Sequence, residues 1–109
     1  MESNYAAYLR ELNTKDLYED ENGFLVYSIN GDYFQLEEIF VKREMRNKGI
    51  ASSYIKLAEE MAKEIKCKYL RGYIIAAYDK STESIQFHMN RGFRLEKVVS
   101  GIIYIVKEV

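Results

Sequence analysis

The sequence has no proline, a single cysteine and no long apolar run in its 109 residues. One cysteine, Cys67, excludes an internal disulfide and a zinc site built from several cysteines. No apolar stretch approaches the roughly 20 residues that a membrane-spanning helix needs, so we expect no membrane span. The first residues lack the charged-then-apolar pattern of a signal peptide, so the expected location is the cytoplasm.

An excess of charge of one sign is also missing. The formal net charge of −1 argues against a general binder of nucleic acid or of membrane surfaces. Low-complexity linkers and internal repeats are absent as well, and the length suits a single domain over residues 1–109. Hydrophobic residues make up 48% and charged residues 30%, which is typical of a folded globular protein.

Positive charge is instead local, in a loop that precedes a helical pattern. Lys42, Arg43, Arg46 and Lys48 lie within seven positions, and apolar residues at helical spacing begin at Ile50. A helix start leaves its first N–H groups unpaired and carries partial positive charge. The loop and the helix start therefore predict a site for a small anion, most naturally a phosphate or pyrophosphate.

The first half of the chain predicts one helix and one hairpin. Apolar spacing predicts a helix over residues 3–17, and the acidic stretch 18–23 ends in a turn. Residues 24–29 alternate as a strand, and Asn30-Gly31 predicts a type I′ turn into a return strand over 32–41.

The return strand changes its pattern midway. Phe34 and Leu36 share one parity and Ile39 and Val41 share the other, so a regular strand would expose one of the two pairs. One extra residue at Glu37-Glu38 would bring both pairs to one face, and we predict a β-bulge there. Such a bulge separates the strand from its neighbour and frees backbone groups for a ligand.

The second half predicts two helices between strands. A long amphipathic helix is expected over residues 48–66, and the dense apolar run 67–77 is expected to be a central strand buried on both faces. A shorter helix, capped by Asp79 or Ser81, runs to about residue 90, and strands 93–99 and 102–109 close the fold. The order α-β-β-α-β-α-β-β predicts an α/β fold with a mixed sheet in three layers.

Two segments resemble the GCN5-related N-acetyltransferases (GNAT). That family carries Arg/Gln-x-x-Gly-x-Gly/Ala after a strand and at the start of a long helix, here Arg46-Asn47-Lys48-Gly49-Ile50-Ala51. It also has an aromatic-rich helix that ends in a Gly-Phe step, here Phe87-His88-Met89-Asn90-Arg91-Gly92-Phe93. The resemblance extends from about Tyr33 to the C-terminus.

The resemblance implies an acetyl-CoA-dependent N-acetyltransferase that acts on an amine of a small molecule or a protein, without a metal. The loop backbone would hold the pyrophosphate of the donor, and the strand end at Ile39 would pair with its pantetheine amides. The thioester would lie between the diverging strands 33–41 and 67–77. The residues expected to bind the cofactor are Ile39, Phe40, Val41, Arg46, Asn47, Lys48, Gly49, Ile50, Ala51, Ser52, Ser81 and Phe87.

The chemistry would need a general base for the amine and a general acid for the thiolate. Glu37 and Glu38, beside the bulge, are the candidate bases; their other reading is two carboxylates that face solvent. His88 stands where many members of the family have the tyrosine that serves as general acid. Ser81 stands where many have an asparagine that faces the cofactor.

A departure from the family lies at the N-terminus. Members usually have a strand and two helices before the first hairpin, and here one predicted helix takes their place. The acceptor side would then be open, or a second subunit in a homodimer would complete it. The alternative function is a non-catalytic module that binds CoA or a protein partner. A P-loop hydrolase is excluded because Gly-x-x-x-x-Gly-Lys-Ser/Thr is absent.

Overall fold

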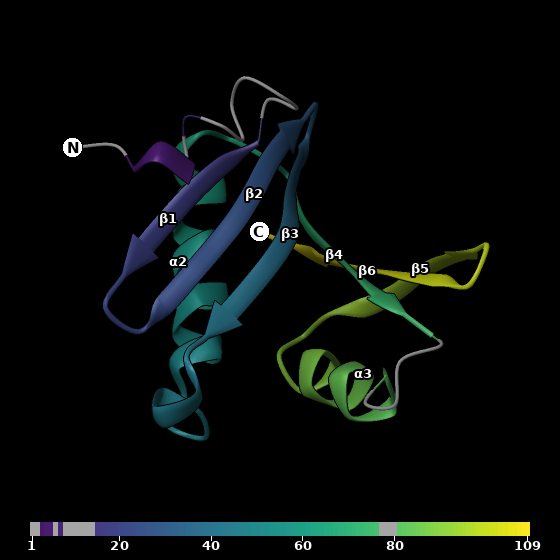
Figure 1. Ribbon diagram of the computed structural model, residues 1–109. Helices are drawn as coiled ribbons and strands as arrows, with labels where there is room; N and C mark the ends of the chain where they lie inside the picture. The colour runs from purple at the N-terminus through teal and green to yellow at the C-terminus, as the bar shows by residue number, and fades with distance from the viewer. Residues whose placement is uncertain (1–2, 6, 8–14, 77–80) are drawn as a thin grey trace.

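The computed structural model describes residues 3–5, 7, 15–76 and 81–109, with the backbone alone for Ser81. Six strands form one sheet in the order β1-β2-β3-β4-β6-β5 (Figure 1). The strands are β1 (Asp16–Asp20), β2 (Gly23–Asn30), β3 (Tyr33–Val41), β4 (Tyr69–Ile75), β5 (Arg94–Val99) and β6 (Ile102–Glu108). The helices are the short 3₁₀ turn η1 (Arg43–Met45), α2 (Ile50–Glu64) and α3 (Ser81–Met89).

The sheet is mixed, as predicted. Strands β1, β2 and β3 form an antiparallel meander, and β4, β6 and β5 form a second antiparallel group. The two groups meet where β3 pairs in parallel with β4, after the crossover through α2. The α/β fold class with helices between strands is therefore confirmed.

Strand β1 is a correction to the sequence prediction. Asp16 and Leu17 were expected to end a helix, and residues 18–20 were expected to belong to an acidic turn. They instead pair antiparallel with β2, from Asp16 opposite Tyr27 to Asp20 opposite Gly23. The segment is an edge strand, where charged side chains are common because one side faces solvent, and its composition therefore resembles a loop. The helical part of that prediction agrees at Asn4, Tyr5 and Ala7, and residues 8–14 lie outside the described part.

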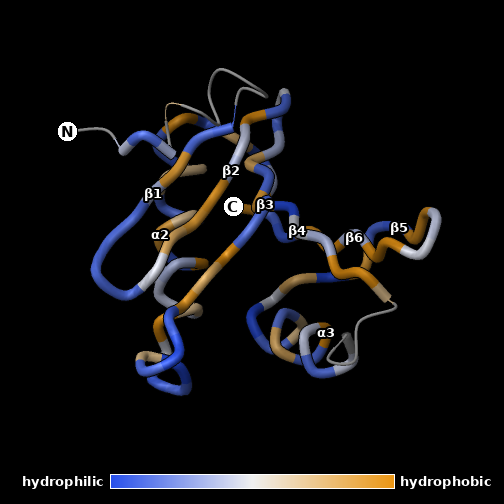
Figure 2. Tube along the Cα trace, viewed as in Figure 1, coloured by the Kyte–Doolittle hydropathy of each residue, from blue (hydrophilic) through white to orange (hydrophobic). Residues whose placement is uncertain are grey.

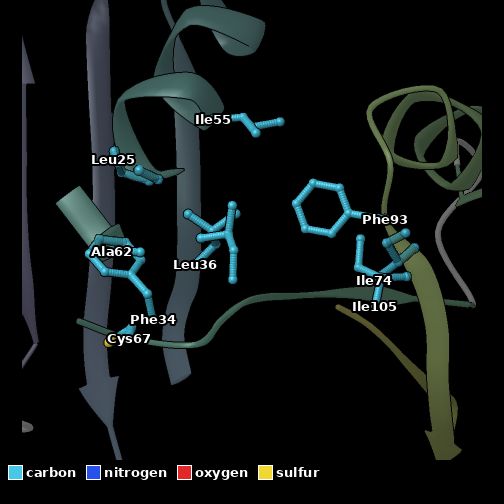
Figure 3. Packing of buried hydrophobic residues seen from close by; sticks show 11 residues of the cluster. Leu25, Phe34, Leu36, Ile55, Ala62, Cys67, Ile74, Phe93 and Ile105 are labelled. Atoms are coloured by element: carbon cyan, nitrogen blue, oxygen red, sulfur yellow. The ribbon is translucent and has the colours of Figure 1, made fainter. Parts of the chain in front are cut away.

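The two α-helices, α2 and α3, pack on one face of the sheet. Helix α2 lies against the β1–β3 half, and α3 lies below the β4–β6–β5 half (Figure 1). The ring of Phe93 joins the two halves, between Leu36 and Ile55 on one side and Ile74 and Ile105 on the other (Figure 3). Complete burial of a side chain of this size contributes about 1.5–3 kcal/mol, so this cluster holds the helices to the sheet.

The opposite face of the sheet is covered in part by the N-terminal residues. Leu25 belongs to the core beneath α2, so the adjacent Phe24 points to the other face. There the Tyr5 ring meets the Phe24 ring edge-on, with centroids 6.0 Å apart. This contact places the described N-terminal residues in a third layer.

Strand β4 differs from its prediction of burial on both faces. Leu70, Gly72 and Ile74 are buried on the helix face, but Tyr73 on the other face is 38% exposed. The strand is also shorter than residues 67–77, and Ala77 lies outside the described residues. Its high apolar content arises partly from tyrosine, whose ring can line a polar surface while its hydroxyl meets water.

Two turns and the helix bounds refine the predictions. The β2–β3 turn is centred on Gly31-Asp32 rather than Asn30-Gly31, and of these two only Gly31 has positive φ, at 61°. That combination suits a type II′ turn instead of type I′. Helix α2 spans Ile50–Glu64, shorter than residues 48–66, because Gly49 adopts φ 79° immediately before it. Helix α3 begins at Ser81, while Asp79 lies outside the described residues.

Candidate functional site

The site is organised by the divergence of β3 from β4. The two strands pair only from Tyr33 opposite Tyr69 to Gln35 opposite Arg71, and then separate (Figure 1). On the other side of β3, Leu36 lies opposite Tyr27 and Glu38 lies opposite Val26, which leaves Glu37 as the extra residue. The predicted bulge at Glu37-Glu38 is therefore confirmed. Beyond it, no strand of the described residues pairs with the β3 edge that faces β4.

A cavity of about 440 Å³ lies at the end of β3, on the helix face. This size is within the roughly 300–1,000 Å³ typical of small-molecule sites. Nine of the residues expected to bind a cofactor line it: Ile39, Val41, Arg46, Asn47, Gly49, Ile50, Ala51, Ser52 and Phe87. The structure thus brings the strand end, the basic loop, the start of α2 and one residue of α3 to a single hollow.

The start of α2 presents backbone N–H groups to this cavity. No side chain caps the helix, and the Ser53 amide makes the first helical bond, to the Gly49 oxygen at 3.1 Å. The amides of Ile50, Ala51 and Ser52 precede that bond and have no helical acceptor. Their partial positive charge favours an anion.

Gly49 is required by the backbone conformation rather than by crowding. Its φ of 79° is one that residues with a side chain rarely adopt, yet a Cβ added there would meet nothing within 4 Å. A large side chain at this position would therefore be strained and would extend into open space beside the helix start.

The basic loop before the helix is mostly hydrophilic (Figure 2), and Met45 is its apolar residue. Arg46 is anchored in it, because its Nε donates to the Val41 oxygen at 2.9 Å. Lys48 is exposed and does not line the cavity. Of these two cations, Arg46 lines the cavity and Lys48 directly precedes Gly49 in the sequence.

Two further residues expected to bind the cofactor, Phe40 and Ser81, are not among those that line the cavity. The Phe40 side chain is 41% exposed and stacks on Phe24 with centroids 5.3 Å apart, on the face opposite α2. Only its backbone can serve the cleft. Nothing is described of the Ser81 side chain.

Arg91 is a cavity residue that the sequence reading did not single out. Its Nε and Nη2 donate to Ser52 Oγ at 2.9 and 2.6 Å, and its Nη1 donates to the Phe87 oxygen at 2.8 Å. The guanidinium lies 3.6 Å from the centroid of the Phe87 ring. Arg91 therefore ties the first turn of α2 to the end of α3 and adds a cation to the wall. Met45 also lines the cavity. In the sequence, Arg91 read only as the residue before the glycine that ends a helix.

The three catalytic candidates are not gathered together. Glu37 lies on the polar face of the sheet, where its carboxylate accepts from Ser28 Oγ at 3.0 Å and lies 3.5 Å from Lys15 Nζ. Glu38 is exposed on β3. His88 is part-buried in α3 and does not line the 440 Å³ cavity.

His88 is held in a neutral form. Burial lowers the pKa of His88 first, the Arg91 charge lowers it further, and the bond to the Ser84 oxygen opposes both. Its Nδ1 lies 2.7 Å from that oxygen, and because a carbonyl only accepts, Nδ1 carries the proton. The Phe87 and Phe93 rings both meet the imidazole edge-on. These contacts are those of a packed side chain.

Metal and thiol chemistry find no support in the described residues. No group of three His, Cys, Asp or Glu side chains in that part of the chain could hold a metal ion. Burial raises the pKa of the Cys67 thiol, with the Asp32 charge as a smaller cause, so the thiol stays protonated. No helix in the described residues is long and apolar enough to span a membrane.

Comparison with solved structures shows the fold in several acetyltransferases. The PaiA N-acetyltransferase of Thermoplasma acidophilum, solved with coenzyme A, aligns with a TM-score of 0.74 and 18% identity over 96% of this chain and 68% of its own. A GNAT family acetyltransferase of Elizabethkingia anophelis with acetyl-CoA bound gives 0.75 and 19%, over 98% and 84% of the two chains. A Bacillus subtilis acetyltransferase in complex with CoA gives 0.73 and 14%, over 94% and 83%.

Sequence comparison identifies the family. No curated protein sequence matches the chain. The model of the acetyltransferase (GNAT) family matches residues 11–93, which include β1 to β4, both described helices and the cavity. The match spans more than half of the chain, and the architecture agrees with it. The chain belongs to the GNAT family of acetyltransferases.

Proposed function

We propose that this chain binds acetyl-CoA in the 440 Å³ cavity and transfers the acetyl group to an amine. The observation that carries the proposal is that the first α2 residues and two cations, Arg46 and Arg91, line one cavity at the end of β3, where β3 has separated from β4. Membership of the GNAT family and the CoA or acetyl-CoA bound by the Thermoplasma, Elizabethkingia and Bacillus structures support the identity of the donor.

The donor would bind in two parts. Its pyrophosphate would lie on the amides of Ile50, Ala51 and Ser52, with Arg46 and Lys48 beside it. Its pantetheine would run along the unpaired edge of β3 from Val41 toward Ile39 and bond the backbone there, as an added strand does. The thioester would then reach the opening between β3 and β4.

The reaction needs one bond formed and one broken. The amine nitrogen attacks the thioester carbonyl carbon, the C–N bond forms, and the C–S bond breaks to release the CoA thiolate. Glu37 is our candidate base because it is the bulge residue and 19% exposed, while Glu38 faces solvent. Its carboxylate takes the proton that the amine loses.

The proton for the thiolate would come from solvent in this proposal. His88 is packed between two phenylalanine rings with its Nδ1 proton directed at Ser84, so its geometry suits packing better than proton donation. The same observation favours the second candidate function, a CoA-binding module without catalysis.

Thermal unfolding with and without acetyl-CoA tests donor binding. A ligand at about a hundred times its Kd adds about 2.7 kcal/mol to the free energy of unfolding, so the melting temperature should rise clearly. The absence of any rise would sink both CoA-dependent functions. A rise without release of CoA thiol over a broad amine panel would favour the binding module.

A matched pair of glycine variants locates the donor. Gly49→Glu should abolish the rise, because it adds a carboxylate and backbone strain at the helix start. Gly101→Glu is the control, since Gly101 has φ 77°, open space around it and a place in the β5–β6 turn. Normal stabilisation of Gly49→Glu by acetyl-CoA would show that the pyrophosphate is misplaced.

A further inference from the structure

A second cavity, of about 320 Å³, lies on the other face of the sheet. Its walls come from four strands, β2, β3, β4 and β6, together with Lys97 of β5. The lining side chains on β3 and β4 alternate with the core residues: Gln35 lies between Phe34 and Leu36, and Arg71 follows Leu70. The cavity therefore lies across the sheet from the helices and from the cofactor cavity.

The two cavities lie on opposite faces of the sheet beside the same stretch of β3. Ile39 lines the cofactor cavity, and Glu37, two residues earlier on the same strand, lines the polar one. The Tyr73 hydroxyl of β4 donates to the main-chain oxygen of Glu37 across the gap between the two strands, at 3.0 Å. An acyl group that reached this gap from the helix face would lie beside Glu37 and Tyr73 of the polar cavity.

One end of the polar cavity suits an amine. The Glu37 carboxylate is present there with the Ser28 hydroxyl, and Tyr73 adds a second hydroxyl. A protonated amine would compete with Lys15, whose Nζ lies 3.5 Å from the Glu37 carboxylate, and it would find hydroxyl oxygens as further acceptors.

The cavity is also lined by two cations, and one of them has no carboxylate partner among the described residues. Arg71 is already engaged, since its Nε lies 2.9 Å from Glu96 Oε1 and its guanidinium lies 3.7 Å from the centroid of the Tyr33 ring. Lys97 lies over the Tyr104 ring, 5.0 Å from its centroid, and it has no carboxylate partner in the part of the chain that the structure describes. Lys97 can therefore receive an anionic group of a ligand.

We propose that the polar cavity is the acceptor site and takes a small amine that carries a carboxylate, such as a free amino acid. The amine would lie at Glu37 and the carboxylate at Lys97, and the volume, near the lower end of ligand pockets, suits a small molecule. This inference rests on the proposed function, because it assigns the acceptor of the same reaction.

The test compares acceptors that differ only in the carboxylate. Acetyl transfer is measured for protein amino acids and for their carboxamides, which keep the amine and lose the negative charge. We expect KM to be about fivefold lower for the acids, as an ion pair near the surface allows. Equal KM values for acids and amides would overturn the proposal while the acetyltransferase function stands.

Lys97→Gln tests the residue. It should raise KM for the acids by about fivefold and leave the amides unchanged. Lys63→Gln, an exposed cation on α2, is the control and should change neither. An equal effect of Lys97→Gln on acids and amides would contradict the assignment.

Binding without acetyl-CoA separates the two proposals. Amide NMR signals of the protein are followed during titration with pooled amino acids and with pooled amino acid carboxamides. We expect the signals of Glu37 and Lys97 to shift with the acids and not with the carboxamides. No shift with the acids overturns the acceptor proposal, whatever the result with acetyl-CoA.

Discussion

The Tyr73 hydroxyl on β4 donates to the main-chain oxygen of Glu37 on β3 at 3.0 Å, at a level where the two strands no longer pair. Burial, followed by the Glu37 charge, raises the pKa of Tyr73, so its hydroxyl keeps its proton and serves as the donor. The bond joins the bulge residue of β3 to β4 beyond the last paired residues of the two strands.

Tyr73→Phe should lower the free energy of unfolding by about 1 kcal/mol, the usual net value of one hydrogen bond. The ring stays, so the packing loss is small. The sequence has no tryptophan, and urea unfolding followed by circular dichroism is the suitable measurement. Tyr18→Phe is the control, because its hydroxyl makes an exposed contact of 3.4 Å to Asp20. A loss no greater than that of the control would show that the Tyr73 bond does not stabilise the opening.

Arg91→Lys should weaken acetyl-CoA binding about tenfold, which corresponds to about 1.4 kcal/mol. Lysine keeps the charge but cannot make the paired bonds to Ser52 Oγ and the bond to the Phe87 oxygen. The first turn of α2 would then lose its tie to α3. Isothermal titration of acetyl-CoA measures the change, with exposed Arg94→Lys as the control. Wild-type affinity in Arg91→Lys would mean that only its charge matters, and Arg91→Met would then be the weaker binder.

His88 should make stability depend on pH in a defined window. Its folded pKa lies below the ordinary value of 6.5, so the unfolded chain binds the proton more readily. The contribution of His88 is complete above that ordinary value and is lost as pH falls below it toward the folded pKa. The free energy of unfolding should therefore decline as solutions are acidified through this range, as urea titrations would show.

His88→Gln should remove this part of the decline, because glutamine does not titrate. It should also leave kcat for acetyl transfer within about threefold, since the proposal gives His88 no proton-transfer step, and such a step is worth about a hundredfold or more. A fall in kcat of that larger size would return His88 to the role of general acid.

Features with a local cause were predictable from the sequence. The change of parity between Leu36 and Ile39 placed the bulge, because side chains on a strand alternate with period two. The helix start was predicted within two residues of its position, because apolar residues at helical spacing begin at Ile50. The lining of the cofactor cavity followed largely from these two features and from the resemblance to the family.

Features that depend on distant contacts were missed. Strand β1 is recognised by its pairing with β2, since its own acidic composition resembles a turn. Arg91 becomes part of the cavity only because Ser52, far away in the sequence, lies within reach of its guanidinium. The lining of the polar cavity likewise comes from β2, β3, β4, β5 and β6, so no single segment of the sequence could predict it.

The sequence by itself determined the α/β class, the bulge and the helix start after Gly49, because each follows from the period of a strand or helix or from the conformational freedom of a glycine. Only the tertiary structure decided that His88 packs against Phe87 and Phe93. It also decided that Glu37 lines the same cavity as Lys97 and Tyr104 on the polar face. The physical reason is that exposure and charge pairing of these groups depend on which strands and helices surround them. The cavity at the start of α2 could therefore be predicted largely from local sequence, whereas the polar cavity is formed only when the strands assemble into the sheet.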